Sequence, residues 1–370
     1  MTTALAMALL APVALSQTRQ PQQQSAGGLL REIEHLRVVG SVLYVAAHPD
    51  DENTRLLAWL VGERGLDATY LSLTRGDGGQ NLIGTEQAEL LGVVRTGELL
   101  AARRIDGADQ RFTRARDFGY SKSAEEALAS WGHAAALSDV VRAIRELQPD
   151  VVITRFGPDD DTHGHHVASA ILAAEAFEKA ADPGYRTEGL GPWQADRLVR
   201  NQSSWRIDAS TDTSKWLSVD VGGYDPRTGR SWSEIAADSR TMHKSQGFGS
   251  APAAGPQREY FAAVAGNVPP VGADLFDGLD LGWSRIEGTG PLDRALDRAA
   301  DRFDPRDPAG SLPDLARAHG LLDELEAGPW VARKRADLEA VMAGCAGLWL
   351  TARADTAAVT PGGTLKVTLT

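Results

Sequence analysis

The sequence contains a single cysteine, Cys345, among its 370 residues, so no disulfide can form within one chain. This cysteine stands in the apolar run VMAGCAGLWL, where a buried, inert thiol is expected rather than a catalytic one. Low-complexity tracts are absent too. Basic residues are in the minority, because 38 Lys and Arg stand against 50 Asp and Glu, which gives a net charge of −12. This balance argues against nucleic acid or an anionic membrane surface as the main partner.

The first residues resemble an export signal. Residues 4–15, ALAMALLAPVAL, form an apolar stretch that is too short to span a membrane, and Ala14-Leu15-Ser16 offers small residues for cleavage. A positively charged start is missing, and the alternative is a disordered tail with a chance apolar patch. We predict that residues 1–16 are a signal peptide, that residues 17–34 are a linker, and that the mature protein is secreted or periplasmic.

Strand-like and helix-like segments alternate up to about residue 182. Their lengths are those of a strand–helix–strand unit, which predicts an α/β fold with a Rossmann-like, mostly parallel sheet and helices on both faces. Buried strands are expected at 41–47, 68–74 and 149–156, and helices at 52–65, 86–105, 134–147 and 167–181.

The pattern changes beyond residue 265. A Pro-, Gly- and Asp-rich loop comes first, and helices with alternating charge are expected at 291–303, 313–326 and 331–343. We therefore predict a loop and helical appendage over residues 266–352. The last residues, DTAAVTPGGTLKVTLT, combine a turn with strand-like alternation, and we predict that residues 353–370 begin a β-sandwich module.

Three polar motifs each follow the end of a predicted strand. They are HPDDE at 48–52, TRGDGG at 74–79 and DDDTHGHH at 159–166. In open α/β sheets, ligands bind in the crevice beyond the carboxyl ends of the strands. The three motifs are therefore expected to meet at one rim of the sheet.

Two of these motifs have the spacing of metal ligands. His48 and Asp51 are three residues apart, as are His163 and His166, and two imidazoles with one carboxylate form a catalytic type of zinc site with an open position. An all-oxygen calcium or magnesium site would leave the histidines unexplained. The alternative is that Asp50 and Asp51 only cap a helix. Two histidine-bearing loops at the same rim favour a metal.

The AHPDDE motif after the first strand, with a later H-x-x-H at a helix start, resembles the PIG-L/LmbE-like family of zinc-dependent N-deacetylases. The resemblance covers residues 35–265 and includes LTRGDGGQN at 73–81, the Arg95…Glu98 pair and SRTMHKSQGFG at 239–249. It implies a hydrolase that removes N-acetyl groups from N-acetylglucosamine-type sugars or conjugates.

The resemblance also implies roles for single residues. His48, Asp51 and His166 would hold one Zn²⁺ per chain, or another divalent transition metal. Asp50 would be the general base on the metal-bound water, and His163 would face the developing oxyanion. These roles agree with the chemistry of amide hydrolysis, because zinc lowers the pKa of bound water towards ~7 and a neighbouring carboxylate can accept the proton.

One departure from the family pattern concerns the second histidine motif. The family's usual H-P-D-H is His163-Gly164-His165-His166 in this sequence, so His165 replaces an acid. It is open whether His165 adds a ligand, tunes the site or faces solvent. Asp161-Thr162 also stands where some relatives have a tyrosine.

Three further residues are candidates for binding the substrate. Arg95 is one, because a guanidinium binds carbonyl and hydroxyl oxygens in a fixed geometry, although an exposed ion pair with Glu98 or Glu89 is the alternative. Asp77 and His243 are the others, with an ordinary turn aspartate and a packed histidine as the alternatives.

The sequence therefore predicts a secreted, metal-dependent amidohydrolase acting on a small molecule or glycan that bears an N-acetyl group. One alternative is another metal-dependent hydrolase on the same scaffold, such as an esterase or a phosphoesterase, for which Arg75, Arg95 and Arg155 would be available to phosphate. The other is a carbohydrate-binding protein with a degenerate site. The carboxylate of Asp50 argues against it, because binding alone does not need a base.

Overall fold

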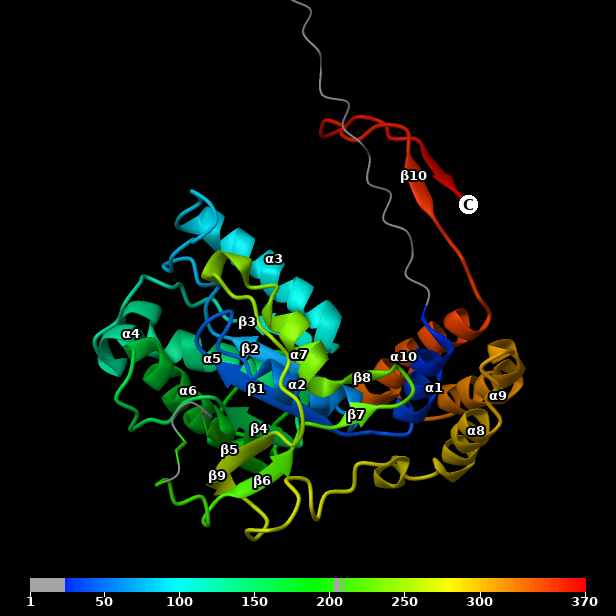
Figure 1. Cartoon of the computed structure of the whole chain (residues 1–370), viewed down its shortest axis with the longest axis horizontal. Helices are drawn as coiled ribbons and strands as arrows, with labels where there is room; N and C mark the ends of the chain where they lie inside the picture. Colours follow the sequence, from blue (N-terminus) through cyan, green and yellow to red (C-terminus); the bar gives the residue numbers. More distant parts are fainter. Residues whose placement is uncertain (1–23, 203–206, 209) are drawn as a thin grey trace, which may run out of the picture.

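The computed structural model describes residues 24–202, 207–208 and 210–370. The predicted signal peptide, residues 1–16, lies outside the described residues. Figure 1 shows a sheet with helices on both sides, a group of helices beside it, and a hairpin that projects away at the C-terminus. Within the described residues, no helix is both long enough and apolar enough to cross a membrane.

A seven-stranded sheet forms the centre of the molecule. Its strands are β1 (Ser41–Ala46), β2 (Asp67–Ser72), β3 (Asp109–Phe112), β4 (Val151–Thr154), β5 (Arg197–Gln202), β6 (Leu217–Asp220) and β9 (Arg258–Gly266). Their order is β3-β2-β1-β4-β5-β9-β6. The first five strands pair in parallel, whereas β9 is antiparallel to both β5 and β6. The predicted mostly parallel α/β sheet is therefore confirmed.

Helices cover both faces of the sheet, because successive side chains of a strand point to opposite faces. In β1, Val42, Tyr44 and Ala46 belong to one apolar cluster, whereas Leu43 and Val45 belong to another. The first cluster is covered by α2 (Thr54–Gly62), α3 (Glu89–Asp106) and α7 (Trp232–Arg240). The second is covered by α4 (Ala124–Trp131), α5 (His133–Leu147) and α6 (Gly164–Ala181).

Helix α6 begins at Gly164, three residues before the predicted start at 167. His163 is its N-cap, and the side chain of His163 accepts a hydrogen bond from the backbone N–H of His165. A capped start of this kind places His165 and His166 in the first helical turn. The histidine motif is therefore held by regular secondary structure and not by a free loop.

Most of the remaining helices form a separate apolar cluster beside the sheet (Figure 1). Part of the predicted linker belongs to it, since residues 26–35 form a helix whose Leu29 and Ile33 are buried. Cys345 is also buried there, as expected. The helices are α1 (Ala26–His35), α8 (Gly290–Asp301), α9 (Leu312–Asp323) and α10 (Pro329–Cys345), with the short helices η3 (Trp283–Arg285) and η4 (Pro308–Ser311).

Two small strand pairs complete the fold. Strands β7 (Tyr224–Asp225) and β8 (Arg230–Ser231) form a ribbon before α7, and the short helix η2 (Lys244–Gln246) follows α7. Strands β10 (Ala352–Ala354) and β11 (Val367–Leu369) form the exposed C-terminal hairpin. The predicted last strand thus pairs with β10 and not with the main sheet, and the β-sandwich module stays a prediction.

Candidate metal centre and active site

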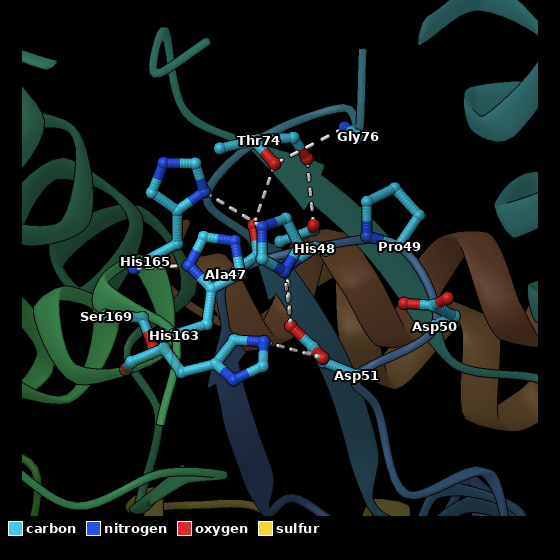
Figure 2. A network of polar contacts seen from close by, with 12 residues as sticks. Ala47, His48, Pro49, Asp50, Asp51, Thr74, Gly76, His163, His165 and Ser169 are labelled. Carbon is cyan, nitrogen blue, oxygen red and sulfur yellow. Dashed lines mark hydrogen bonds and ion pairs between the residues drawn. The ribbon is translucent and has the colours of Figure 1, made fainter. Parts of the chain in front are cut away.

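The polar motifs meet at the carboxyl ends of β1, β2 and β4. The hydroxyl of Thr74 donates to the carbonyl oxygen of Ala47 at 3.0 Å, and the Tyr70 hydroxyl donates to that of His48. Strand β2 therefore holds the chain that leaves β1. Figure 2 shows His48, Asp51, His163 and His165 gathered together, with Asp50 pointing away from them.

His48, Asp51 and His166 bring three donor atoms within 4.8 Å of one another. Asp51 Oδ2 lies 3.1 Å from His48 Nδ1, and Asp51 Oδ1 lies 3.4 Å from His166 Nε2. Ligand atoms about 2 Å from a tetrahedral zinc ion are about 3.3 Å apart, so these separations fit such an ion. The structure therefore brings together the three ligands implied by the family resemblance.

The carboxylate of Asp51 is the negative centre of this group. Burial alone would raise the pKa of Asp51, but the neighbouring His166 and His48 hold it well below its usual range. Burial alone would lower the pKa of His48, and the charge of Asp51 more than offsets this, so that the pKa is raised. An ionised carboxylate between two imidazoles offers the charge and the ligand atoms that a divalent cation requires.

The second nitrogen of His48 faces His165. His48 Nε2 lies 3.0 Å from His165 Nδ1, while His48 Nδ1 faces Asp51. His165 is fully buried, and its ring lies 4.5 Å from that of Phe118 and 4.8 Å from that of Trp131. Burial, together with the charge of His48, lowers the pKa of His165 to about 2, so its ring is neutral. The option that His165 faces solvent is thereby excluded.

A second histidine group shares one residue with the first. The donor atoms of His48, His163 and His165 also lie within 4.8 Å of one another. The two groups use opposite nitrogens of the His48 ring, because Nδ1 faces Asp51 and Nε2 faces His165. Only the first group combines two imidazoles with a carboxylate.

His163 is a neutral donor beside the centre. Its Nδ1 accepts from the backbone N–H groups of His165 at 3.2 Å and Ser121 at 3.4 Å, so the proton of the neutral ring sits on Nε2. Burial and the charges of His48 and His166 lower the pKa of His163 to about 4. At neutral pH the ring therefore offers an uncharged N–H.

Asp50 occupies a strained position next to the ligands. Its φ of 98° is rare for a residue other than glycine, and such a conformation costs roughly 1–3 kcal/mol. Its backbone N–H donates to Glu52 Oε2 at 2.8 Å, and its Oδ2 lies 3.3 Å from Arg95. Burial raises the pKa of Asp50 to about 6 despite the opposing charge of Arg95.

Arg95 lies behind Asp50 and is almost completely buried, which differs from its predicted role as a substrate contact. Its guanidinium donates to the carbonyl oxygens of Pro49 and, at 3.1 Å, of Gly76. A Cβ on Gly76 would lie 2.2 Å from this guanidinium, and Gly76 also has a positive φ of 68°. Gly76 thus makes room for Arg95, which positions the HPDDE loop.

His243 is likewise buried beneath the loop and not at a cavity, so the packed alternative describes it better than a substrate contact. Its Nε2 lies 2.7 Å from Glu52 Oε1, which Arg103 also approaches at 3.3 Å. Burial alone would raise the pKa of Glu52, but His243 and Arg103 lower it to about 2. The supporting roles of Glu52 and Arg103 were not evident in the sequence.

Asp77, the third candidate for substrate binding, accepts a hydrogen bond from the backbone N–H of Asp117 at 3.3 Å. Its carboxylate also lies 3.8 Å from Arg116. Both contacts lie away from the cavity described next, and they are those of an aspartate that joins two loops. The contacts of Asp77 are therefore those of an ordinary turn aspartate, the alternative to a substrate contact.

A cavity of about 540 Å³ opens beside Asp50, Asp51 and His166. This volume is in the range of small-molecule sites. His48 and His163 are not part of the cavity wall. The wall also includes Arg55, Arg155, Phe156, Arg240, Phe248 and Glu259.

Comparison with known proteins gives a consistent set of relatives. The family described as "PIG-L: GlcNAc-PI de-N-acetylase" matches residues 43–177. A 1D-myo-inositol 2-acetamido-2-deoxy-alpha-D-glucopyranoside deacetylase from Geodermatophilus obscurus is 35% identical over 205 residues, covering 48% of this chain and 69% of that protein. A deacetylase of the same description, numbered 1, from Frankia alni is 31% identical over 185 residues, covering 45% of this chain and 64% of that protein.

Solved structures show more distant similarity. The N,N'-diacetylchitobiose deacetylase from Pyrococcus horikoshii is 19% identical, with a TM-score of 0.41, over 56% of this chain and 70% of that protein. This chain thus matches only about two thirds of the length of each of these three proteins.

Proposed function

This chain belongs to the PIG-L family, and we propose that it is a metal-dependent amidohydrolase that removes the N-acetyl group from an N-acetylglucosamine-type sugar or conjugate. One observation carries the proposal. His48, Asp51 and His166 converge on one point, and Asp50 lies in the wall of the cavity beside them. The names of the curated relatives, deacetylases of a 2-acetamido sugar joined to inositol, support the choice of substrate class.

His48, Asp51 and His166 would hold the metal. A divalent ion bound there, zinc or another transition metal, would supply Lewis-acid polarisation of the amide carbonyl and of the attacking water. The separations of 3.1 and 3.4 Å between the donor atoms support this assignment, as does the mixture of two imidazoles with one carboxylate.

Asp50 is the general base in this proposal. Its pKa of about 6 leaves the carboxylate ionised at neutral pH while keeping it basic enough to accept a proton from the attacking water. The same carboxyl then donates that proton to the nitrogen of the leaving amine. Arg95 and Glu52 hold the side chain and the backbone of Asp50 in place during both transfers.

His163 is the donor that faces the oxyanion. Because Nδ1 already accepts backbone hydrogen bonds, its Nε2–H is the group left to donate to the carbonyl oxygen as negative charge develops on it. A neutral imidazole suits this role, since its pKa of about 4 keeps it uncharged throughout the neutral range.

Acetate release from a panel of N-acetylated sugars, with and without a chelator, tests the proposal. We expect release that stops when the metal is removed and returns when zinc is restored. Acetate release that survives complete removal of the metal would reject the metal centre. A fully loaded protein that cleaves no N-acetyl sugar of the panel would reject the substrate class.

We also propose that the protein is exported. The apolar N-terminal stretch and the small residues before Gln17 support this proposal. Mass measurement of the protein from its native host should give a mature chain that begins near Gln17. A chain that retains Met1 in the cytoplasmic fraction would contradict it.

A further inference from the structure

Three arginines in the cavity wall differ in their partners. Arg55 has a carboxylate partner, because its guanidinium lies 3.3 Å from Glu259. Arg155 contacts two neutral groups, the side-chain oxygen of Asn201 at 3.1 Å and the Tyr44 hydroxyl, and Arg240 stacks over the ring of Phe248 at 4.1 Å. In the part of the chain that the structure describes, neither Arg155 nor Arg240 forms an ion pair.

Asn201 cannot balance the charge of Arg155. Its side-chain oxygen also accepts from the Tyr44 hydroxyl and from the Asn53 amide, each at 3.0 Å. One neutral oxygen is therefore shared by three donors. Arg155 is half-buried at the end of β4, where a cation that contacts no carboxylate directly is costly.

The acids near Arg155 are already engaged. Glu259 and Asp51 both contribute to the field at Arg155. Glu259 is bound by Arg55 and by the Asn201 amide, and Asp51 lies between His48 and His166. The nearby negative charge therefore has other partners.

A bound divalent metal would add further positive charge to this cavity. Each acid of the wall has a cationic or imidazole partner, so the charges of Arg155, Arg240 and the metal would together exceed the negative charge. A positively charged cavity with low-dielectric walls attracts and holds anions. The substrate itself is the natural source of the missing negative charge.

We propose that Arg155 and Arg240 bind an anionic group, a carboxylate or a phosphate, on the sugar conjugate whose N-acetyl group is removed. The inference deepens the proposed function and rests on it. Both arginines line the same cavity as Asp50, and about 540 Å³ is more than an acetamido group requires. A guanidinium fork matches carboxylate and phosphate oxygens, and Phe248 orients the Arg240 plane. The anionic group is recognised and not cleaved.

Deacetylation of matched sugars tests this inference. The substrates are N-acetylglucosamine, its 1-phosphate and 6-phosphate, and N-acetylmuramic acid, which carries a carboxylate. We expect at least one anionic compound to exceed the neutral sugar in kcat/KM by about tenfold or more. In Arg155→Gln and in Arg240→Gln, the ratio of anionic to neutral kcat/KM should fall about 10–100-fold, mainly through KM.

Lys244→Gln is the matched control, because Lys244 is an exposed cation on η2, close in sequence to Arg240 and outside the cavity wall. Its ratio should equal that of the wild type. Equal kcat/KM for neutral and anionic sugars in the wild type would overturn the inference. An unchanged ratio in both arginine variants, or an equal fall in Lys244→Gln, would also do so. If Arg155→Gln fails to fold, Arg155→Lys, which keeps the charge but loses the fork, replaces it.

A binding measurement separates this inference from the proposed function. Calorimetry of the metal-loaded protein with glucosamine, glucosamine 1-phosphate and glucosamine 6-phosphate requires no turnover. Binding of a phosphorylated sugar that is weakened in Arg155→Gln and Arg240→Gln supports the anion site even if no N-acetyl sugar is cleaved. Cleavage of N-acetyl sugars without any preference for anionic ones supports the function and overturns the anion site.

Discussion

Two segments meet at the candidate metal centre, and they are held in place by opposite means. The HPDDE loop, residues 48–52, is held by charges. Arg95 lies 3.3 Å from Asp50, and the carboxylate of Glu52 pairs with both Arg103 and His243. These groups are buried, so their interactions are only weakly screened by salt.

The HGHH segment, residues 163–166, is held by rings and by a helix start. Phe156 stacks on His166 with centroids 3.9 Å apart and planes only 3° apart, and Phe118 and Trp131 flank His165. The difference matches the tasks proposed for the two segments. The proposed carboxylate base needs fixed charges to tune its pKa, whereas the imidazoles need a wall of matching shape and apolar character.

The largest expected effect lies on the charged segment. Asp50→Asn keeps the shape of the side chain but cannot accept a proton, so kcat should fall about 10²–10⁴-fold while the metal stays bound. Excess zinc should not restore activity. Steady-state kinetics with elemental analysis of the same samples checks this. A fully active Asp50→Asn would place the base elsewhere, with His163 as the next candidate.

Asp51→Asn should behave differently from Asp50→Asn, although the two residues are adjacent and chemically identical. A neutral amide is a poor replacement for an anionic ligand, so metal affinity should fall, by about 100-fold or more, and excess zinc should partly restore activity. Metal competition with a chelator measures the change. Equal metal content and equal zinc rescue in the two variants would show that this division of roles is wrong.

A substitution of His165 tests how the HGHH segment supports metal binding. If His48 Nε2–H donates to His165 Nδ1, His165→Leu should weaken metal binding about 10–100-fold, because His48 loses the partner that fixes its tautomer. His165→Asn is the control, since its side-chain oxygen can accept in place of Nδ1, and its loss should be smaller. Unchanged affinity in His165→Leu would mean that the ring only fills space.

The smallest effect on activity at neutral pH, about tenfold or less, is expected for Glu52→Gln, which keeps a hydrogen-bonding group below the loop. Its signature is the pH dependence of stability. The pKa of Glu52 is lowered from 4.5 to about 2, so its stabilisation is complete above pH 4.5 and is lost as the pH falls towards 2. The pKa of His243 is raised, so its contribution is present below its usual pKa and is lost as the pH rises through the raised value.

Urea unfolding from pH 2 to 8 in the presence of a chelator measures this dependence. The difference in unfolding free energy between the wild type and Glu52→Gln should shrink at both ends of the range. A difference that stays constant with pH would show that the charges of Glu52 and His243 do not stabilise the loop.

The parts of the site that could be predicted from the sequence depend on local spacing. His48 and Asp51 are three residues apart at a strand end, and a single turn brings them together. Strands β1, β2 and β4 were recognisable because each is a short, buried run dominated by apolar, β-branched and aromatic residues. Strands β3, β5, β6 and β9 were not predicted. The sequences DQRF of β3 and RLVRNQ of β5 contain charged and amide residues, and β3 also lies at the sheet edge, where no apolar run is required.

The positions of Arg95 and His243 could not be predicted in the same way. Arg95 binds the carbonyl of Pro49, 46 residues away, and His243 pairs with Glu52, 191 residues away. These contacts arise only after α3 and α7 pack on the sheet. From the sequence alone, a polar residue is expected at the surface, because the neighbour that buries it is not known.

The backbone of Asp50 has a consequence for how this protein can change. At a φ of 98°, glycine would relieve the strain, and a chain selected for thermal endurance alone would be expected to carry glycine there. Glycine would also remove the side chain that takes the proton in the proposed reaction. Relief of the backbone strain and retention of the proposed base therefore oppose each other at this position, and a selection for heat resistance that introduces glycine here should yield an inactive protein.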